Sequence, residues 1–310
     1  HTGAINFVRP SIGSWVVYGL GTENQDLPGF VTINPDGNPG GGQNFGSAFL
    51  PAAYQGTRVS AGDAPIAHIR NRRRKPAAQR RHLDLLQSMN RDALASSLDP
   101  LELEGIVESY ELAFRMQTAV PELMDIAQEP DAVRERYGIN SPATASFGMQ
   151  CLMARRLAEA DVRFIEISHR GWDQHNNLQT ALPRNCQAID QPIAALLQDL
   201  KDRDLLRDTL LVWTGEFGRT PQEQSNFNGR RHQNRGFTAW MAGAGVRGGM
   251  RYGATDEIGA EAVEGKVHIH DLHATILHLL GLDHERLTYR YSGRDFRLTN
   301  VEGRVVSEIL

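Results

Sequence analysis

The hydrophobic and polar positions in the second half of the chain predict an alternation of helices and strands. Apolar residues recur at three- and four-residue spacing in segments that predict helices over residues 145–159, 187–203 and 271–281. Short apolar runs predict strands over residues 162–168, 209–214 and 237–243. This alternation is typical of an α/β protein with a mostly parallel, buried sheet flanked by helices.

Two helical patterns occur in the first half of the chain. Pro10, followed by the apolar Trp15 and Tyr18, predicts a short helix over residues 10–20. Apolar residues also recur with helical spacing over residues 76–130, where prolines interrupt the pattern. We interpret this second region as a helical pair inserted between elements of the sheet.

The other segments of the first half lack periodicity. Residues 34–47 are dense in Gly, Pro and Asn, which predicts a loop, and residues 51–69 are expected to run irregularly over the surface. No internal repeat is visible. We therefore expect a single α/β domain over residues 1–310, with a helical insertion at about 76–130.

Composition excludes several classes of protein. The 310 residues are 40% hydrophobic, which is enough for a sizeable core. The formal net charge of −4 argues against broad nucleic-acid binding, and the basic run at 70–75 is interpreted as a solvated loop rather than a phosphate-binding patch. No apolar run approaches the roughly 20 residues of a membrane-spanning helix. Cys151 and Cys186 are too few for a disulfide framework or a cysteine zinc site.

Candidate functional residues stand beside the predicted strands. Asp173 and His175 follow strand 162–168, and Glu216 follows strand 209–214, whereas His232 stands just before the third strand. In open α/β sheets, ligands bind beyond the carboxyl ends of the strands. We therefore expect these four side chains to meet at one end of the sheet.

Their chemistry points to a metal ion and an anionic ligand. Carboxylates and imidazoles without a thiolate suit Zn²⁺ or Mn²⁺ best, and Ca²⁺ or Mg²⁺ is compatible with the carboxylates. Arginines follow in the same loops, and Arg219 and Arg235 are the candidates for substrate binding. A guanidinium group matches the oxygens of phosphate or sulfate.

Structural roles are the alternative for each of these residues. Asp173 could cap a helix, His175 and His232 could be solvated surface histidines, and Glu216 could simply pair with Arg219. A further group, which we interpret as structural, lies near the C-terminus and consists of His268, His270, His273 and His278. Within that group, His270 and Asp271 are expected to cap a helix, and His270 is the best reserve ligand.

The sequence resembles a bacterial family catalogued as a domain of unknown function. The resemblance covers essentially the whole chain, and the phrases that carry it include 148-GMQCLMARRLAEADVRFIEIS-168, 172-WDQH-175, 210-LLVWTGEFGRTP-221 and 229-GRRH-232. That family is similar to sulfatases and belongs with the alkaline phosphatase superfamily. The resemblance implies parallel strands flanked by helices, metals at the strand ends, and export to the periplasm or secretion.

Enzymes of that superfamily hydrolyse phosphate or sulfate esters, commonly with two metals and a Ser, Thr or modified Cys nucleophile. In this comparison Asp173 and His175 match an Asp…His pair of ligands. Glu216 falls where the Asp of an Asp-His pair belongs, and His232 fits a lone histidine ligand.

Two departures from the family pattern matter. Phe217 follows Glu216 in place of a histidine, so a ligand of the second metal is missing. The first strand, with its aspartate and the nucleophile, has no counterpart, and we expect it upstream of His1, which makes this chain a fragment. Ser11 and Ser14 are the early hydroxyls at a helix start, and we interpret them as capping or packing residues.

The sequence therefore favours a metal-dependent hydrolase of phosphate or sulfate esters, acting on a small anionic ester or a sulfated glycan. The alternative is a catalytically silent module of the same fold that binds anionic glycans or a protein partner, because a fold does not fix a function. A third hypothesis is a fragment with neither activity. The sequence does not indicate an oligomeric state.

Overall fold

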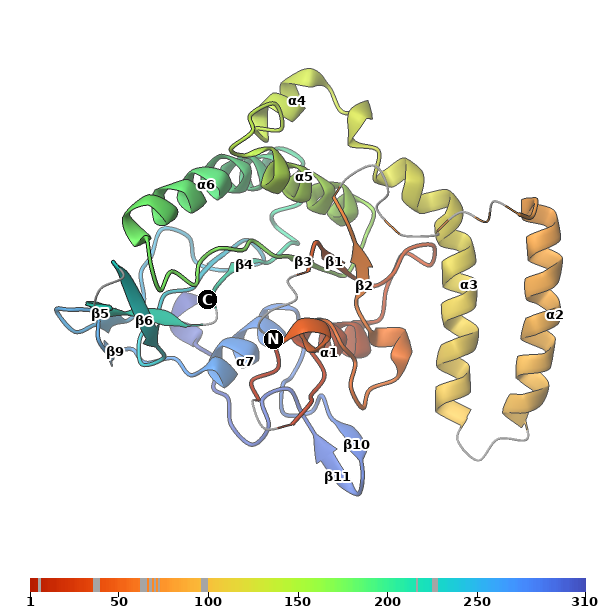
Figure 1. Cartoon of the computed structure of the whole chain (residues 1–310). Coiled ribbons are helices and arrows are strands. Elements are labelled where there is room, and N and C mark those ends of the chain that lie inside the picture. The colour runs from red at the N-terminus through yellow and green to blue at the C-terminus, as the bar shows by residue number, and fades with distance from the viewer. Residues whose placement is uncertain are drawn as a thin grey trace. The chain divides into compact units, whose positions relative to one another are not determined.

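The computed structural model describes the whole chain except residues 5–6, 36–39, 62–65, 67–68, 70, 72, 96–99, 216 and 225–227. The chain divides into two compact units, and Figure 1 labels their helices and strands where there is room. Unit 1 comprises His1–Pro130 and Leu152–Ser168, and unit 2 comprises Asp131–Cys151 and His169–Leu310.

A three-stranded parallel sheet organises unit 1. Its order is β2-β1-β3, from the strands β1 (Phe30–Ile33), β2 (Thr57–Val59) and β3 (Phe164–Ile167). In the register, Val31 lies opposite Thr57 on one side and Ile165 on the other. All four residues of β1 are buried, as expected for a central strand whose two faces are covered.

Alternate residues of β1 serve the two faces of this sheet. Phe30 contacts Phe164 edge to face and meets helix α1 (Ile12–Leu20), where a Cβ added to Gly13 would lie 2.5 Å from the Phe30 ring. The helix can approach the sheet this closely because residue 13 is a glycine. On the other face, apolar residues form the core cluster of Leu27, Val31, Ile33, Val59, Met116, Val120, Met124, Met153, Ala154, Leu157 and Val162.

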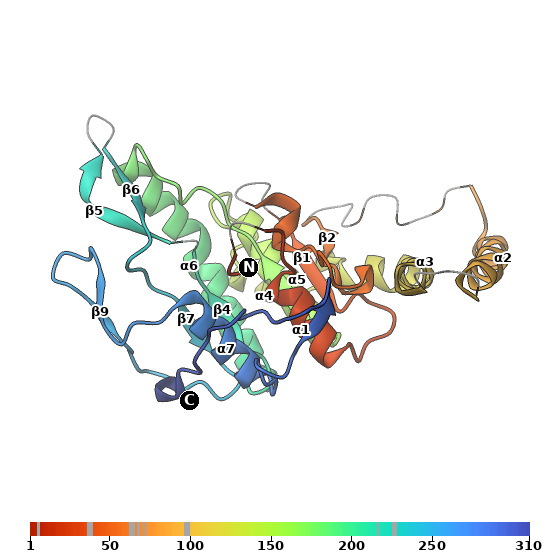
Figure 2. The ribbon, with the colours of Figure 1, turned by 90° about the horizontal axis from the view of Figure 1, so that it is seen from below.

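The predicted helical pair is present in unit 1. Helices α2 (Pro76–Ala95) and α3 (Pro100–Leu123) lie side by side, as Figures 1 and 2 both show. Nη1 and Nη2 of Arg80 both donate to Glu111 at 2.8 Å, and Gln87 Nε2 donates to the Val107 carbonyl at 2.7 Å. These contacts join α2 to α3, while α3 itself contributes Met116 and Val120 to the core.

Unit 1 also contains a buried ion-pair cluster around Glu129. The cluster lies just beyond a 3₁₀ turn at Ile126–Gln128, and its arginines come from helix α5 (Ala145–Glu159). Arg155 Nη2 lies 2.7 Å from Glu129 Oε1, and Arg156 Nη1 contacts the same oxygen. The carboxylate therefore fixes the end of α5 against the segment that follows α3.

Unit 2 combines helices with antiparallel strand pairs. Its helices include α4 (Asp131–Arg136), α6 (Leu178–Asp202) and α7 (Ile269–Leu279). The strand pairs are β4 (Leu211–Trp213) with β7 (Trp240–Ala242), β5 (Gly218–Gln224) with β6 (Gly229–Gln233), β8 (Ala254–Thr255) with β9 (Ala262–Glu264), and β10 (Tyr289–Tyr291) with β11 (Arg294–Phe296). Tyr137 Oη and Arg136 Nη1 both donate to the buried Asp199, which joins α4 to α6.

Short 3₁₀ turns complete the described chain at Gly41–Asn44 and Ala52–Tyr54 in unit 1 and at Ser307–Ile309 in unit 2.

The α/β class is confirmed, but the expected mostly parallel sheet is too broad a description. Among the described residues, parallel pairing is confined to β1, β2 and β3, whereas β4 and β7 pair antiparallel. Strand β2 lies in the segment predicted to be irregular, and a hairpin occupies the predicted loop before residue 237. Helix α5 begins and ends as predicted, whereas α6 begins nine residues earlier than expected. Of the basic run at 70–75, residues 70 and 72 lie outside the described residues. No described helix is long and apolar enough to cross a membrane.

Candidate metal centre

The segment after residue 168 folds into tight turns. Gln174 N donates to the Trp172 carbonyl and His175 N to the Asp173 carbonyl, both at 3.0 Å. Trp172 Nε1 donates to His169 Nδ1 at 3.0 Å, and burial lowers the pKa of His169, so this imidazole is a neutral acceptor. The compact turn at residues 173–175 brings the side chains of Asp173 and His175 together.

The hairpin of β5 and β6 packs directly against this segment. Arg230 N donates to the Gln174 carbonyl at 3.0 Å, and Leu178 N donates to the Asn228 carbonyl at 2.9 Å. A Cβ on Gly229 would lie 2.2 Å from the His175 carbonyl, so the backbones can approach only because residue 229 is a glycine. Figure 2 shows the hairpin beside the first turns of α6.

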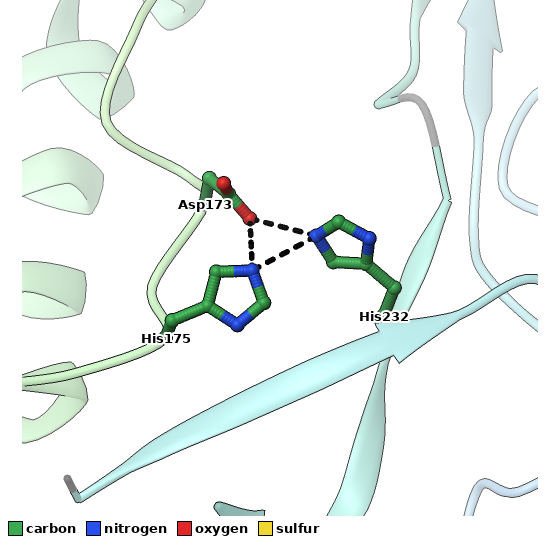
Figure 3. A group of neighbouring side chains, drawn as sticks. All are labelled: Asp173, His175 and His232. Carbon is green, nitrogen blue, oxygen red and sulfur yellow. Dashed lines mark hydrogen bonds and ion pairs between the residues drawn. The ribbon is translucent and has the colours of Figure 1, made fainter.

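This packing brings three ligand-type side chains together. His175 Nε2 lies 3.1 Å from Asp173 Oδ1, His232 Nε2 lies 3.0 Å from the same oxygen, and the two Nε2 atoms are 3.0 Å apart. In Figure 3 the carboxylate and both rings point toward one another, two from the turn and one from β6. We call these three residues the 173/175/232 cluster.

The spacing within the cluster suits a common metal ion. Two donors that each lie about 2.1 Å from one ion are about 3.0 Å apart at a right angle and about 3.4 Å apart at the tetrahedral angle. The three observed separations fit one face of a six-coordinate ion. One carboxylate oxygen and two imidazole nitrogens form a donor set for Zn²⁺, Mn²⁺ or Fe²⁺.

The tautomer of His175 is fixed by Gln224. His175 Nδ1 lies 3.0 Å from Gln224 Oε1, and because an amide oxygen only accepts, Nδ1 carries the proton. The lone pair of Nε2 therefore faces the cluster. A hydrogen bond from the remote ring nitrogen is the usual support of a metal-binding histidine. Without an ion, a proton on His232 Nε2 satisfies the cluster, and a divalent cation would replace that proton.

Asp173 is held in its ionised form. Partial burial acts to raise the pKa of Asp173, but hydrogen bonds from His232 and Arg219 outweigh burial and hold that pKa below its ordinary value. Arg219 Nη1 donates to Asp173 Oδ1 at 2.7 Å. Arg219 also lies opposite His232 in the β5–β6 ladder, so their side chains share a face of the hairpin.

The other sequence-predicted residues are placed differently. Glu216 lies outside the described residues. Arg235 lies beyond the end of β6, where its backbone N donates to Gln233 Oε1, and the contacts of the described residues do not bring its side chain to the cluster. The ring of Phe217 stacks obliquely on His232 with centroids 4.6 Å apart. The structure therefore brings together Asp173, His175, His232 and Arg219.

Sequence reasoning missed two residues that shape the site. Gln224 carries no chemistry that marks it as functional, because its role depends on the position of β5 beside residue 175. Gly229 could have been noticed as the first residue of 229-GRRH-232, but only the tertiary structure shows which backbone passes it.

Comparison with known proteins gave one match. No curated protein and no solved structure matches the chain. A family model described as "Protein of unknown function (DUF1501)" matches residues 1–310. Because the match spans the whole chain, the chain belongs to the DUF1501 family.

Proposed function

We propose that the 173/175/232 cluster holds a divalent transition-metal ion and that the protein is a metal-dependent hydrolase of phosphate or sulfate esters. The observation that carries this proposal is the mutual approach of Asp173 Oδ1, His175 Nε2 and His232 Nε2 within 3.1 Å. The protonated Nδ1 of His175 adds to it, since a lone pair then faces the other two donors.

The bound ion would act as a Lewis acid toward a phosphoryl or sulfuryl oxygen. Asp173 and His232 are exposed, so a substrate can reach the cluster from solvent. Arg219 orients the Asp173 carboxylate, and it is therefore better described as a positioning residue than as a substrate clamp. Positive charge on β6, from Arg230 and Arg231, favours an anionic substrate.

The resemblance to sulfatases and the alkaline phosphatase superfamily supports the same reaction class. On that resemblance, Glu216 is proposed as a further ligand, the nucleophile as a residue upstream of His1, and the protein as exported. The substrate would be a small anionic ester or a sulfated glycan. Arg235 is retained as a substrate-binding candidate.

A silent binding module is the second candidate. It is favoured by the position of Phe217, whose ring packs on His232 in the place where the superfamily has a second histidine ligand. A module of this kind would bind a sulfated or phosphorylated glycan without turnover.

The test measures metal content and turnover in the full-length natural protein. Metal analysis after loading with Zn²⁺, Mn²⁺ or Fe²⁺ should give a bound ion that Asp173→Asn and His232→Ala each lose. Aryl phosphates and aryl sulfates serve as substrates. The control is His82→Ala, since His82 is exposed on α2 and distant in sequence from the cluster.

The hydrolase would be supported if the wild type and His82→Ala hydrolyse an ester while Asp173→Asn and His232→Ala lose both the ion and the activity. A wild type that retains the metal ion but hydrolyses neither the aryl phosphates nor the aryl sulfates would favour the binding module. Wild type that takes up no ion sensitive to Asp173→Asn and His232→Ala would overturn the proposal.

A further inference from the structure

We infer that His268, His270 and Glu302 form a second metal site, at the first turn of α7. Glu302 Oε2 lies 3.3 Å from His270 Nδ1 and 3.5 Å from His268 Nδ1. One donor atom from each of the three residues lies within 4.8 Å of the other two. The inference uses none of the residues of the 173/175/232 cluster, so it stands or falls independently of the proposed function.

The segment that carries Glu302 is fixed onto α7 by Asp271. Asp271 Oδ2 accepts from His268 N at 2.9 Å, and Asp271 Oδ1 accepts from Arg304 N at 2.7 Å. Val306 N also donates to Thr275 Oγ1 at 2.9 Å. The two carboxylate oxygens of Asp271 thus hold the backbone of His268 and the backbone of Arg304. The three ligand residues are therefore positioned before any ion binds.

Gly303 allows the close approach of this segment. Its φ is +103°, and a Cβ there would lie 3.0 Å from the Thr299 side chain and 3.1 Å from the His270 carbonyl. Only a glycine adopts this conformation without strain. The turn therefore sets Glu302 directly over the first turn of the helix.

The donor set and its geometry suit a borderline ion. Donors at about 2.0 Å from a tetrahedral ion lie about 3.3 Å apart, close to both carboxylate–imidazole separations. The His270 side chain is 10% exposed, whereas those of His268 and Glu302 are 59% and 60% exposed, so one buried ligand is combined with an open side. Two imidazoles and a carboxylate favour Zn²⁺, Co²⁺ or Ni²⁺ over Mg²⁺ or Ca²⁺.

Helix capping is the competing role for this cluster. His268 Nδ1 accepts from His270 N at 3.2 Å, and with Asp271 it forms a capping box. The sequence-based expectation that His270 and Asp271 cap the helix is thus correct for Asp271, whereas the capping histidine is His268. An ion at His268 Nδ1 would replace the capping hydrogen bond. The positive end of the helix dipole opposes a cation, and the carboxylates of Asp271 and Glu302 offset it.

A substitution separates the two roles. Asparagine is among the best N-cap residues but lacks the imidazole, so His268→Asn should keep the helix start and remove one ligand. Glu302→Gln removes the charged ligand at an exposed position. His278→Ala, an exposed histidine of the same helix, is the matched control.

Isothermal titration with Zn²⁺ and with Co²⁺ supplies the readout, and far-UV circular dichroism checks folding. Wild type and His278→Ala should bind two equivalents. His268→Asn and Glu302→Gln should each weaken one of them at least tenfold, and His232→Ala should remove the other. A wild type that binds a single equivalent, sensitive to His232→Ala alone, would overturn this inference and leave the proposed function standing. A wild type that binds a single equivalent, weakened by His268→Asn and by Glu302→Gln but not by His232→Ala, would support this inference and overturn the proposed function.

Discussion

At the scale of single residues, the protonation of one imidazole decides what the cluster can bind. The Gln224 amide oxygen places the proton of His175 on Nδ1, which leaves the Nε2 lone pair facing Asp173 and His232. In the other tautomer, His175 Nε2 would carry the proton, and no lone pair of this ring would face the cluster. Gln224 would therefore support the proposed metal ion through His175, without being a ligand itself.

Removing this amide should weaken metal binding without unfolding the hairpin. Gln224→Ala is expected to lower the affinity for Zn²⁺ about 10- to 100-fold, the usual effect of deleting a partner of a metal-binding histidine. Gln224→Glu keeps an acceptor for Nδ1 and should retain most of the affinity. Calorimetric titration measures both variants, and equal affinity in Gln224→Ala and wild type would show that the tautomer is fixed in another way.

At the scale of elements, unit 1 depends on a buried ion-pair cluster. Burial alone would raise the pKa of Glu129, but Arg155 and Arg156 more than compensate, so this pKa lies below its ordinary value. The carboxylate is therefore more easily ionised in the folded chain than in the unfolded chain. Its contribution to stability is complete above a pH of about 4.3, the ordinary pKa of glutamate, and is lost as the pH falls through the lowered pKa.

Glu129→Gln should consequently destabilise the protein in a pH-dependent way. Breaking a buried pair leaves uncompensated arginine charge, so we expect a loss of about 3 kcal/mol in the free energy of unfolding at pH 7. The difference from wild type should shrink as the pH falls below about 4.3, the ordinary pKa of glutamate, because the unfolded wild type then takes up a proton at Glu129 more readily than the folded chain does. Urea unfolding across this range measures it. Glu108→Gln, at an exposed position of α3, is the control, and an equal loss in both variants would contradict the assignment.

At the scale of the whole molecule, the residues proposed to bind the two ions all lie in unit 2. A ligand that binds only the folded state stabilises the structure it contacts, by about 2.7 kcal/mol at a hundredfold excess over the dissociation constant. Amide exchange should therefore slow in residues 173–176 and 229–233 and in the first turn of α7 when Zn²⁺ is added. The parallel sheet of unit 1 provides the internal reference, since it holds neither cluster.

Mass spectrometry of hydrogen exchange can locate this protection. Slower exchange confined to the two clusters is the expected pattern. Protection spread evenly over β1 and β2 as well would indicate a general effect of the ion on stability, and the assignment of the ligands would then fail.

Sequence predicted this molecule best where local pattern suffices. The apolar spacing of residues 145–159 defined α5, and the strand-end rule drew attention to Asp173 and His175. It failed for β1 and β2, because runs of four and three residues are too short to show a period. The direction of a strand also depends on its partner, which is why β4 and β7 were expected in a parallel sheet.

The candidate site was accessible to sequence only in part. Ligand-type residues could be named from their chemistry, but His232 reaches the cluster on a hairpin that was expected to be a loop. Gln224 and Gly229 act through contacts with residues about 50 positions away, which no local pattern encodes. The grouping of His268, His270 and Glu302 likewise depends on a turn that returns to α7.

The irregular register of the β5–β6 hairpin has a consequence for how this family can vary. Between Arg219 and Glu223, β5 advances four residues while β6 advances two, from His232 to Arg230. Arg219, before the irregularity, orients the Asp173 carboxylate. Gln224, after it, places the proton of His175 on Nδ1. Loss or gain of one residue between Arg219 and Glu223 would turn the side chain of either Arg219 or Gln224 to the opposite face of the hairpin. Natural insertions in related chains should accordingly spare this short span, and its length is a better guide to a working metal centre than the identity of the residues within it.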